Sequence, residues 1–218
     1  MKRLPFPVLL RRTAALAALG LLAGCSLLGG GAQRDPVTIH APRLQAQPDP
    51  SWPQVQWQLA IARPIASRLV DSPRMAVRPV PGELQVYRGS AWAQPATDMI
   101  EGSVLRVLEE SGKITGVGRL SSGMRSDYRL LMDLRRFEAD YRGGDLPVAT
   151  IEISASLIDS RDQRIVGRHT FLREQPASAT EVASVASAFD QALASIASEI
   201  AGWTLVQGQA DTQARPRP

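Results

Sequence analysis

The chain of 218 residues is poor in the side chains that usually perform covalent chemistry or bind metals. It contains one cysteine, Cys25, and two histidines, His40 and His169. A single thiol can form neither an intramolecular disulfide nor a thiolate metal cluster. The residues around Cys25 therefore decide what this thiol does.

Cys25 follows a segment that has the parts of a secretory signal peptide. The first twelve residues carry no acidic side chain and four basic ones, which are Lys2, Arg3, Arg11 and Arg12. The next twelve residues carry no charge. Such a leader has a basic start, a short apolar run and small residues before the cleavage site, whereas a bilayer span needs roughly 20 apolar residues. We therefore expect residues 1–24 to be removed as a signal peptide.

The four residues Leu22, Ala23, Gly24 and Cys25 resemble the lipobox of bacterial lipoproteins. The resemblance implies that Cys25 receives a diacylglyceryl thioether, becomes the first residue after cleavage and is acylated at its new amine by a fatty acid such as palmitate. Two or more chains are needed for stable anchoring, since each buried methylene contributes about 0.8 kcal/mol. Ser26, in the place of an aspartate that would favour inner-membrane retention, implies the periplasmic face of the outer membrane. The alternative is an unmodified or structural cysteine behind an ordinary signal peptide.

Removal of the leader changes the charge of the protein. The four basic leader residues account for the whole formal net charge of +4, so the remaining chain is balanced against its 21 acidic residues. Nucleic-acid binding depends on a basic surface that neutralises phosphates. A balanced chain therefore argues against a nucleic-acid partner, and the sequence pI of about 9.8 describes only the precursor.

Composition divides the remaining chain into a tether, a body and a tail. Residues 25–36 are rich in glycine and lack periodicity, which predicts a flexible tether whose eleven or so residues span roughly 17–20 Å. Residues 207–218 contain no apolar residue beyond two alanines, so we expect a disordered tail. The folded domain is then expected over residues 37–206, a length that suits one domain.

Apolar residues that recur every second position predict strands along most of the body. The two segments around the turn Pro81-Gly82 are expected to form an antiparallel hairpin, and the last three an antiparallel meander. Strands are predicted over residues 37–40, 55–63, 74–80, 83–88, 113–120, 126–142, 146–160 and 164–175.

Two helices complete the predicted body. Residues 91–113 have Pro95 near the start and Gly112 at the end, the residues expected at helix termini. Residues 178–203 repeat apolar side chains at spacings of three and four, and Ser178 with Glu181 forms a capping-box pattern. The fold class is therefore expected to be α/β, with a mixed, largely antiparallel sheet and two helices packed on one of its faces.

The body shows no pattern of a catalytic, cofactor-binding or metal site. It has no G-x-S-x-G motif and no phosphate-binding loop, and neither histidine has a ligand at metal spacing. The remaining carboxylates of interest are interpreted as solvated charges beside arginines rather than as an acid–base pair: Asp127, Asp133, Glu138 and Asp140. Apart from the covalent lipid on Cys25, no cofactor is expected, and the protein is not expected to be an enzyme.

Several short stretches stand in an order that resembles one family. These stretches are Tyr87-Arg88 with Ala91-Trp92, Asp127 to Leu130 leading to Phe137-Glu138, and Trp203 in the last helix. Together, behind a lipobox, they resemble the ABC-type transport auxiliary lipoprotein component family over roughly residues 37–203. The resemblance implies a lipoprotein that accompanies an MCE-domain ABC transporter of lipids or other hydrophobic compounds.

By this resemblance the protein is a non-catalytic subunit that docks or caps a periplasmic tube, and a closed ring of identical copies would suit a cyclic tube. Two other classes remain open. A structural or assembly lipoprotein of the outer membrane would lack transporter genes beside its own gene. An envelope hydrolase would show a pocket lined by a polar triad.

Overall fold

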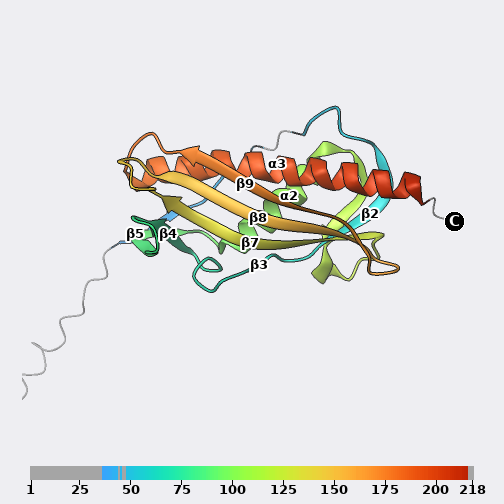
Figure 1. The fold of residues 1–218 in the computed structure, drawn as a ribbon, viewed down its shortest axis with the longest axis horizontal. Coiled ribbons are helices and arrows are strands. Elements are labelled where there is room, and N and C mark those ends of the chain that lie inside the picture. The colour runs from blue at the N-terminus through green and yellow to red at the C-terminus, as the bar shows by residue number, and fades with distance from the viewer. Residues whose placement is uncertain (1–35, 44, 46–47, 216–218) are drawn as a thin grey trace, which may run out of the picture. The chain divides into compact units, whose positions relative to one another are not determined.

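The computed structural model describes residues 36–43, 45 and 48–215. The predicted leader, most of the tether and Cys25 lie outside the described residues. The body begins at Val37, and Figure 1 shows a sheet with two helices laid along it. No helix in the described part of the chain is long and apolar enough to cross a membrane.

The described residues form a nine-stranded mixed sheet, which confirms the predicted fold class. The strands are β1 (Thr38–His40), β2 (Val55–Ile61), β3 (Ile65–Ala66), β4 (Arg74–Arg78), β5 (Gln85–Trp92), β6 (Ile114–Arg119), β7 (Tyr128–Asp140), β8 (Val148–Asp159) and β9 (Ile165–Pro176). The longest pairings, β7 with β8 and β8 with β9, are antiparallel as expected. The remaining short strands form parallel pairs: β1 with β5, β2 with both β6 and β7, and β3 with β7.

Strand β7 organises the sheet. One of its edges pairs with β8 along its whole length, and the other pairs in turn with β2, β3 and β4. Its even-numbered residues from Tyr128 to Leu134 are buried, as their alternation predicts, and Phe137 is buried too. A register shift between Leu134 and Arg136 moves the inward face from even to odd numbers, because a β-bulge adds one residue to the strand.

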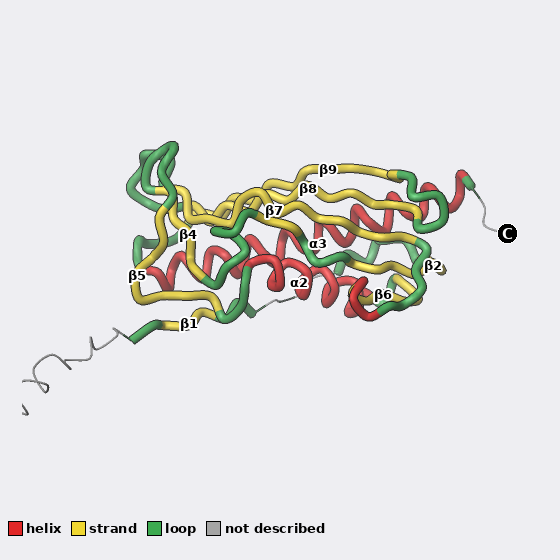
Figure 2. Tube along the Cα trace, turned by 90° about the horizontal axis from the view of Figure 1, so that it is seen from below, coloured by secondary structure: helices red, strands yellow, loops and turns green. Residues whose placement is uncertain are grey.

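The two helices lie on the same side of the sheet (Figure 2). Helix α2 (Ala96–Ser111) begins after Pro95 and ends at Gly112, whose φ of 61° suits glycine. The predicted helix was too long at its start, because Ala91 and Trp92 belong to β5. Helix α3 (Val182–Ala214) packs on β8 and β9 and against α2.

Both ends of α3 differ from the prediction. Its N-cap is Glu181, with no side-chain capping hydrogen bond, so the capping box of Ser178 and Glu181 does not form. At the other end the helix continues through residues 207–214, which we had expected to be disordered. The prediction of a disordered tail is therefore wrong for these eight residues.

Tertiary contacts stabilise the end of α3. Gly208 lies so close to the Trp57 indole that a Cβ there would be 2.5 Å from a ring carbon. The buried Tyr128 hydroxyl lies 3.0 Å from Asp211 Oδ2 and 3.3 Å from the Gly208 carbonyl oxygen. Arg164 also donates to Asp211, at 2.7 Å. These partners come from β2, β7 and the β8–β9 turn, so the polar tail gains structure that its own composition does not favour.

Candidate docking groove

The predicted site residue Cys25 lies outside the described residues, so its lipidation stays a prediction. His40, at the end of β1, packs edge-on against Trp92 with ring centroids 6.3 Å apart. His169, in β9, packs edge-on against Phe171, with ring centroids 4.6 Å apart. In the described part of the chain no group of three or more His, Cys, Asp or Glu side chains could hold a metal ion.

Two carboxylates expected to be solvated are in fact buried. Glu138 is 2% exposed and Asp140 is 7% exposed. Glu138 accepts hydrogen bonds of 2.9 Å from Arg78 Nε and from Arg136 Nε, and Asp140 pairs with Arg136 and Arg142. The interpretation as solvated charges was therefore wrong, because arginines from β4, from β7 and from the turn after β7 surround the two carboxylates. The cluster holds strands together, because Arg78 of β4 and Arg136 of β7 both bind the Glu138 carboxylate.

The carboxylates Asp127 and Asp133 have ordinary structural roles. Asp127 Oδ2 accepts a hydrogen bond of 2.8 Å from the backbone N–H of Gln58, which links the start of β7 to β2. The Asp133 side chain is 47% exposed and lies 3.5 Å from Arg135. Neither forms a pair with a second carboxylate among the hydrogen bonds described.

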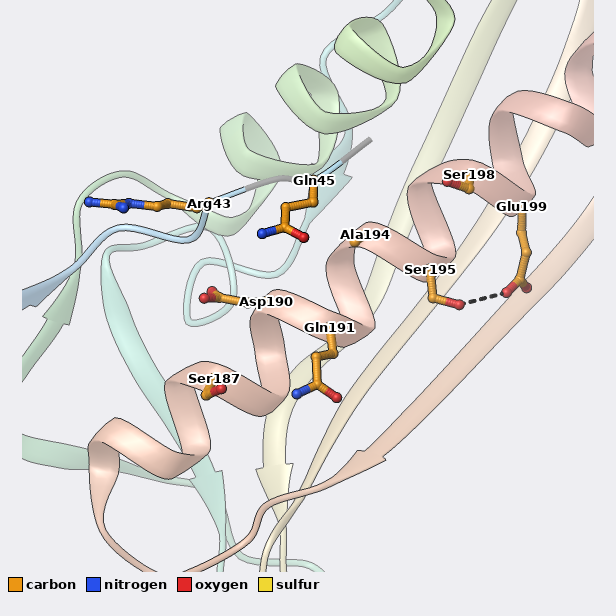
Figure 3. A pocket seen from close by; sticks show the side chains of 9 residues that line it. All are labelled: Arg43, Gln45, Ser187, Asp190, Gln191, Ala194, Ser195, Ser198 and Glu199. Carbon is orange, nitrogen blue, oxygen red and sulfur yellow. Dashed lines mark hydrogen bonds between the residues drawn. The ribbon is translucent and has the colours of Figure 1, made fainter. Parts of the chain in front are cut away.

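A groove of about 600 Å³ runs along the side of α3 that faces away from the sheet (Figure 3). Arg43 and Gln45, from the connection between β1 and β2, form one wall, and side chains of α3 form the other. The helix contributes Ser187, Asp190, Gln191, Ala194, Ser195, Ser198 and Glu199. The opposite stripe of α3 is apolar and packs into the core, so the spacing that buries one face of the helix presents this polar face.

The groove has both hydrogen-bond donors and acceptors. Burial raises the pKa of Asp190 above its usual value, while the nearby charge of His40 opposes this shift. Ser195 Oγ donates to Glu199 Oε1 at 3.1 Å, and Glu199 also pairs with Arg173 of β9. Ser195 is thus hydrogen-bonded to a carboxylate that is already neutralised by an arginine, an arrangement that suits packing rather than nucleophilic attack.

Ala194 is the one apolar side chain in the lining of this groove. Carbon atoms of the longer side chains also line the groove, so it offers apolar contact beside its donors and acceptors. This mixture is typical of a surface that binds another polypeptide.

Sequence reasoning missed the groove. The available signal was the recurrence of Ser187, Gln191 and Ser198 on the face opposite the apolar stripe. That pattern predicts only an exposed helix face. The second wall comes from residues more than 140 positions earlier in the chain, and only the tertiary structure places it there.

The structure is an α/β body with two helices on one side of a mixed sheet and a groove beside α3. Residues 38–201 match the ABC-type transport auxiliary lipoprotein component family, and the chain belongs to this family. The family resemblance read from the sequence is thereby confirmed.

Individual relatives support the same fold. The crystal structure of protein XCC0632 from Xanthomonas campestris is 56% identical, with a TM-score of 0.79, and the match covers 81% of this chain and 99% of that one. A second solved structure, of an uncharacterized protein, has a TM-score of 0.60 at 13% identity, with 76% of this chain and 97% of that chain covered. This likeness concerns the fold alone.

An uncharacterized protein of Bradyrhizobium diazoefficiens is 29% identical over 188 residues, which are 86% of this chain and 50% of that protein. The chain therefore spans about half the length of this curated relative.

Proposed function

We propose that this protein is a lipid-anchored, non-catalytic auxiliary subunit of an MCE-type ABC transport system that moves lipids or other hydrophobic compounds across the cell envelope. The observation that carries the proposal is the family match over residues 38–201, directly behind a lipobox that ends at Cys25. The anchor would hold the body on the periplasmic face of the outer membrane. Ser26, in the place of an inner-membrane retention signal, supports that location.

The chemistry of the body supports an auxiliary role. Hydrophobic cargo needs a dry path, since each exposed methylene costs about 0.8 kcal/mol in water. The groove beside α3 is an open surface groove lined mainly by charged, amide and hydroxyl side chains, so it suits a protein partner better than it suits a dry path for cargo. The partner that we propose for it is the MCE-domain protein of the transporter, whose peptide groups could pair with Gln191, Asp190 and Arg43.

Tethering gives such a subunit a physical advantage. A body held at the membrane by acyl chains has a raised effective concentration there, so weak contacts with a membrane-bound machine become productive. No reaction step needs to be assigned to the body for this role.

Photo-crosslinking in membranes tests the proposal. A photoreactive amino acid at Gln191, on the groove, is expected to capture an MCE-domain protein under conditions that preserve transporter complexes. The matched control places the same group at Leu172, which is 49% exposed in β9. Capture at neither position, with no MCE-domain protein in the purified complex, would count against the transport role. Capture at Leu172 alone would keep that role and remove the groove as its contact surface.

A further inference from the structure

We infer that the outer edge of strand β9 binds β9 of a second copy of this chain, in an antiparallel pair related by a two-fold axis. Among the described strands β9 pairs with β8 alone, so it forms one edge of the sheet (Figure 1). It is 12 residues long, roughly twice the usual length of a strand. A long edge invites pairing with another chain. The inference does not depend on the proposed transport role.

The hydrogen bonds to β8 show which backbone groups of β9 point outward. In an antiparallel pair only every second residue exchanges hydrogen bonds with the partner strand. Beyond one end of β9, the Ala177 N–H donates to the Pro147 carbonyl oxygen at 2.9 Å, so the odd-numbered residues bond to β8. The even-numbered residues therefore direct their N–H and C=O groups away from β8; these are Arg168, Thr170, Leu172 and Glu174.

These four residues form an accessible edge. Within the described part of the chain, the hydrogen bonds made outside the strand ladders include none from their backbone groups. All four are exposed, Leu172 to 49%. The next outward residue, Pro176, has no N–H and so ends the usable edge. An added antiparallel strand could form two backbone hydrogen bonds at each of the four positions.

The order of charges along this edge selects a second copy as the occupant. Arg168 and Glu174 lie at equal distances in sequence before and after Phe171. With a two-fold axis beside Phe171, Arg168 of each copy lies opposite Glu174 of the other, and Thr170 lies opposite Leu172. Opposite charges in facing positions stabilise a strand pair. The edge is thus complementary to itself, as a two-fold interface requires.

Neighbouring registers lack this match. A shift by two residues in one direction places Pro176, which has no N–H, opposite Arg168. The opposite shift places Val166 opposite Glu174, and at Val166 the pairing with β8 is already irregular. Both shifts separate Arg168 from Glu174 of the other copy, so one register combines all the backbone hydrogen bonds with paired charges.

The other charges beside the edge have partners within the same copy. Arg173, which would face His169 of the second copy, pairs with Glu199 of α3, so its charge is balanced. The Glu174 carboxylate binds Arg142 of its own copy. Each carboxylate oxygen has two acceptor sites, so Glu174 can also bind the facing arginine of the second copy.

Complementation between two charge variants tests this contact. In a dimer of R168E two acidic side chains face each other at both ends of the interface, and in a dimer of E174R two basic ones do. We expect each variant to have a dissociation constant at least about tenfold higher than the parent. Sedimentation velocity of the full-length protein in detergent measures this constant.

The mixture of the two variants is the decisive sample. Opposite charges then face each other again at both ends, so labelled R168E with an excess of E174R should bind within about threefold of the parent. The two positions lie about 20 Å apart along one strand, so the restoration cannot arise within one copy. The matched control R106E makes the same charge change on an exposed residue of α2 and should stay within about twofold.

Each remaining outcome overturns the inference. It fails if the parent is monomeric, if either single variant dimerises as well as the parent, or if the mixture stays as weak as its components. An equal loss in R106E would show a general effect of charge in place of this contact. Thermal unfolding within about 2 °C of the parent verifies the fold of each variant. If Arg142 disturbs E174R, the added change R142Q removes that repulsion and the same mixture is measured.

Discussion

Cys25 is the residue on which the proposed membrane attachment depends. Its replacement by alanine in C25A removes the only thiol that can accept a diacylglyceryl group. We expect this variant to keep residues 1–24 or to leave the membrane fraction, and to lack the mass of the acyl chains. Mass spectrometry of the N-terminus and membrane fractionation measure both effects. Unchanged processing and fractionation would contradict the lipid assignment.

Glu138 is a buried carboxylate that two arginines neutralise. In E138Q the charge is lost while the shape is kept, so Arg78 and Arg136 face each other without their shared counter-ion. We expect a loss of about 2–4 kcal/mol in the free energy of unfolding, measured by urea denaturation.

The matched control for Glu138 is D133N. Asp133 lies in the same strand, is half exposed and has one distant arginine partner, so the change should be within about 0.5 kcal/mol. Equal effects of the two variants would show that burial does not determine the contribution of these charges.

Asp190 is expected to make stability depend on pH. Burial raises its pKa in the folded state, so folding favours the protonated form, and this contribution is lost as the pH rises from about 4 through the folded pKa. The variant D190N should therefore melt about 1–2 °C higher than the parent at pH 7, and the difference should shrink below pH 4. A constant difference across this range, measured by differential scanning calorimetry, would refute the role of ionisation.

At the scale of elements, close approach of the α3 helix to its neighbours depends on glycines. Gly202 and Gly208 lie beneath the indoles of Trp52 and Trp57, and a Cβ at either position would come within 2.6 Å of a ring atom. The two tryptophans belong to the loop before β2 and to β2. The two glycines thus allow α3 to pack closely against tryptophans that lie more than 140 residues earlier in the chain.

Two helical glycines are expected to respond to alanine in opposite ways. G208A should lose about 1–3 kcal/mol, because its Cβ overlaps Trp57. G102A in α2 should gain about 0.5–1 kcal/mol, since its Cβ would have a single neighbour at an ordinary 3.8 Å and alanine favours helix. Chemical denaturation measures both. A gain in G208A would show that Trp57 can move away at little cost.

The end of α3 shows how one element depends on others. Residues 207–214 are polar and would not form a helix on their own, because isolated short helices are marginal in water. Tyr128 of β7 and Arg164 of the β8–β9 turn supply hydrogen bonds that stabilise the last two turns. The extended helix in turn covers Tyr128, whose side chain is fully buried.

At the scale of the whole molecule, the proposed removal of the leader would change the charge balance. Loss of residues 1–24 removes four basic residues and no acidic one. We expect the processed protein to focus near neutral pH, several units below the value of 9.8 for the full sequence. Isoelectric focusing of protein from membranes measures this shift. A basic isoelectric point would mean that the leader is retained.

The two faces of the sheet differ in what covers them. Helices α2 and α3 cover one face of the sheet, and the other face presents alternating polar and charged residues of β7, β8 and β9. The candidate groove lies outside both sheet faces, between α3 and the connection that leads from β1 to β2.

The sequence by itself determined the features that depend on local periodicity. Alternation predicted the inward residues of β7 and β8, which are buried, and Gly112 correctly marked the end of α2. The family, the mixed sheet and its two helices also followed from the order of motifs and elements. These predictions succeed because side-chain period and turn chemistry are properties of neighbouring residues.

Only the tertiary structure decided the features that join distant residues. The sequence showed the carboxylates Glu138 and Asp140 but not the burial that makes them structural, since Arg78 reaches Glu138 from another strand. It showed a polar tail but not the contacts of Tyr128 and Trp57 that continue α3. The groove likewise needs Arg43 beside Asp190. Burial and long-range hydrogen bonds outweigh local preference at each of these places, and no local pattern encodes them.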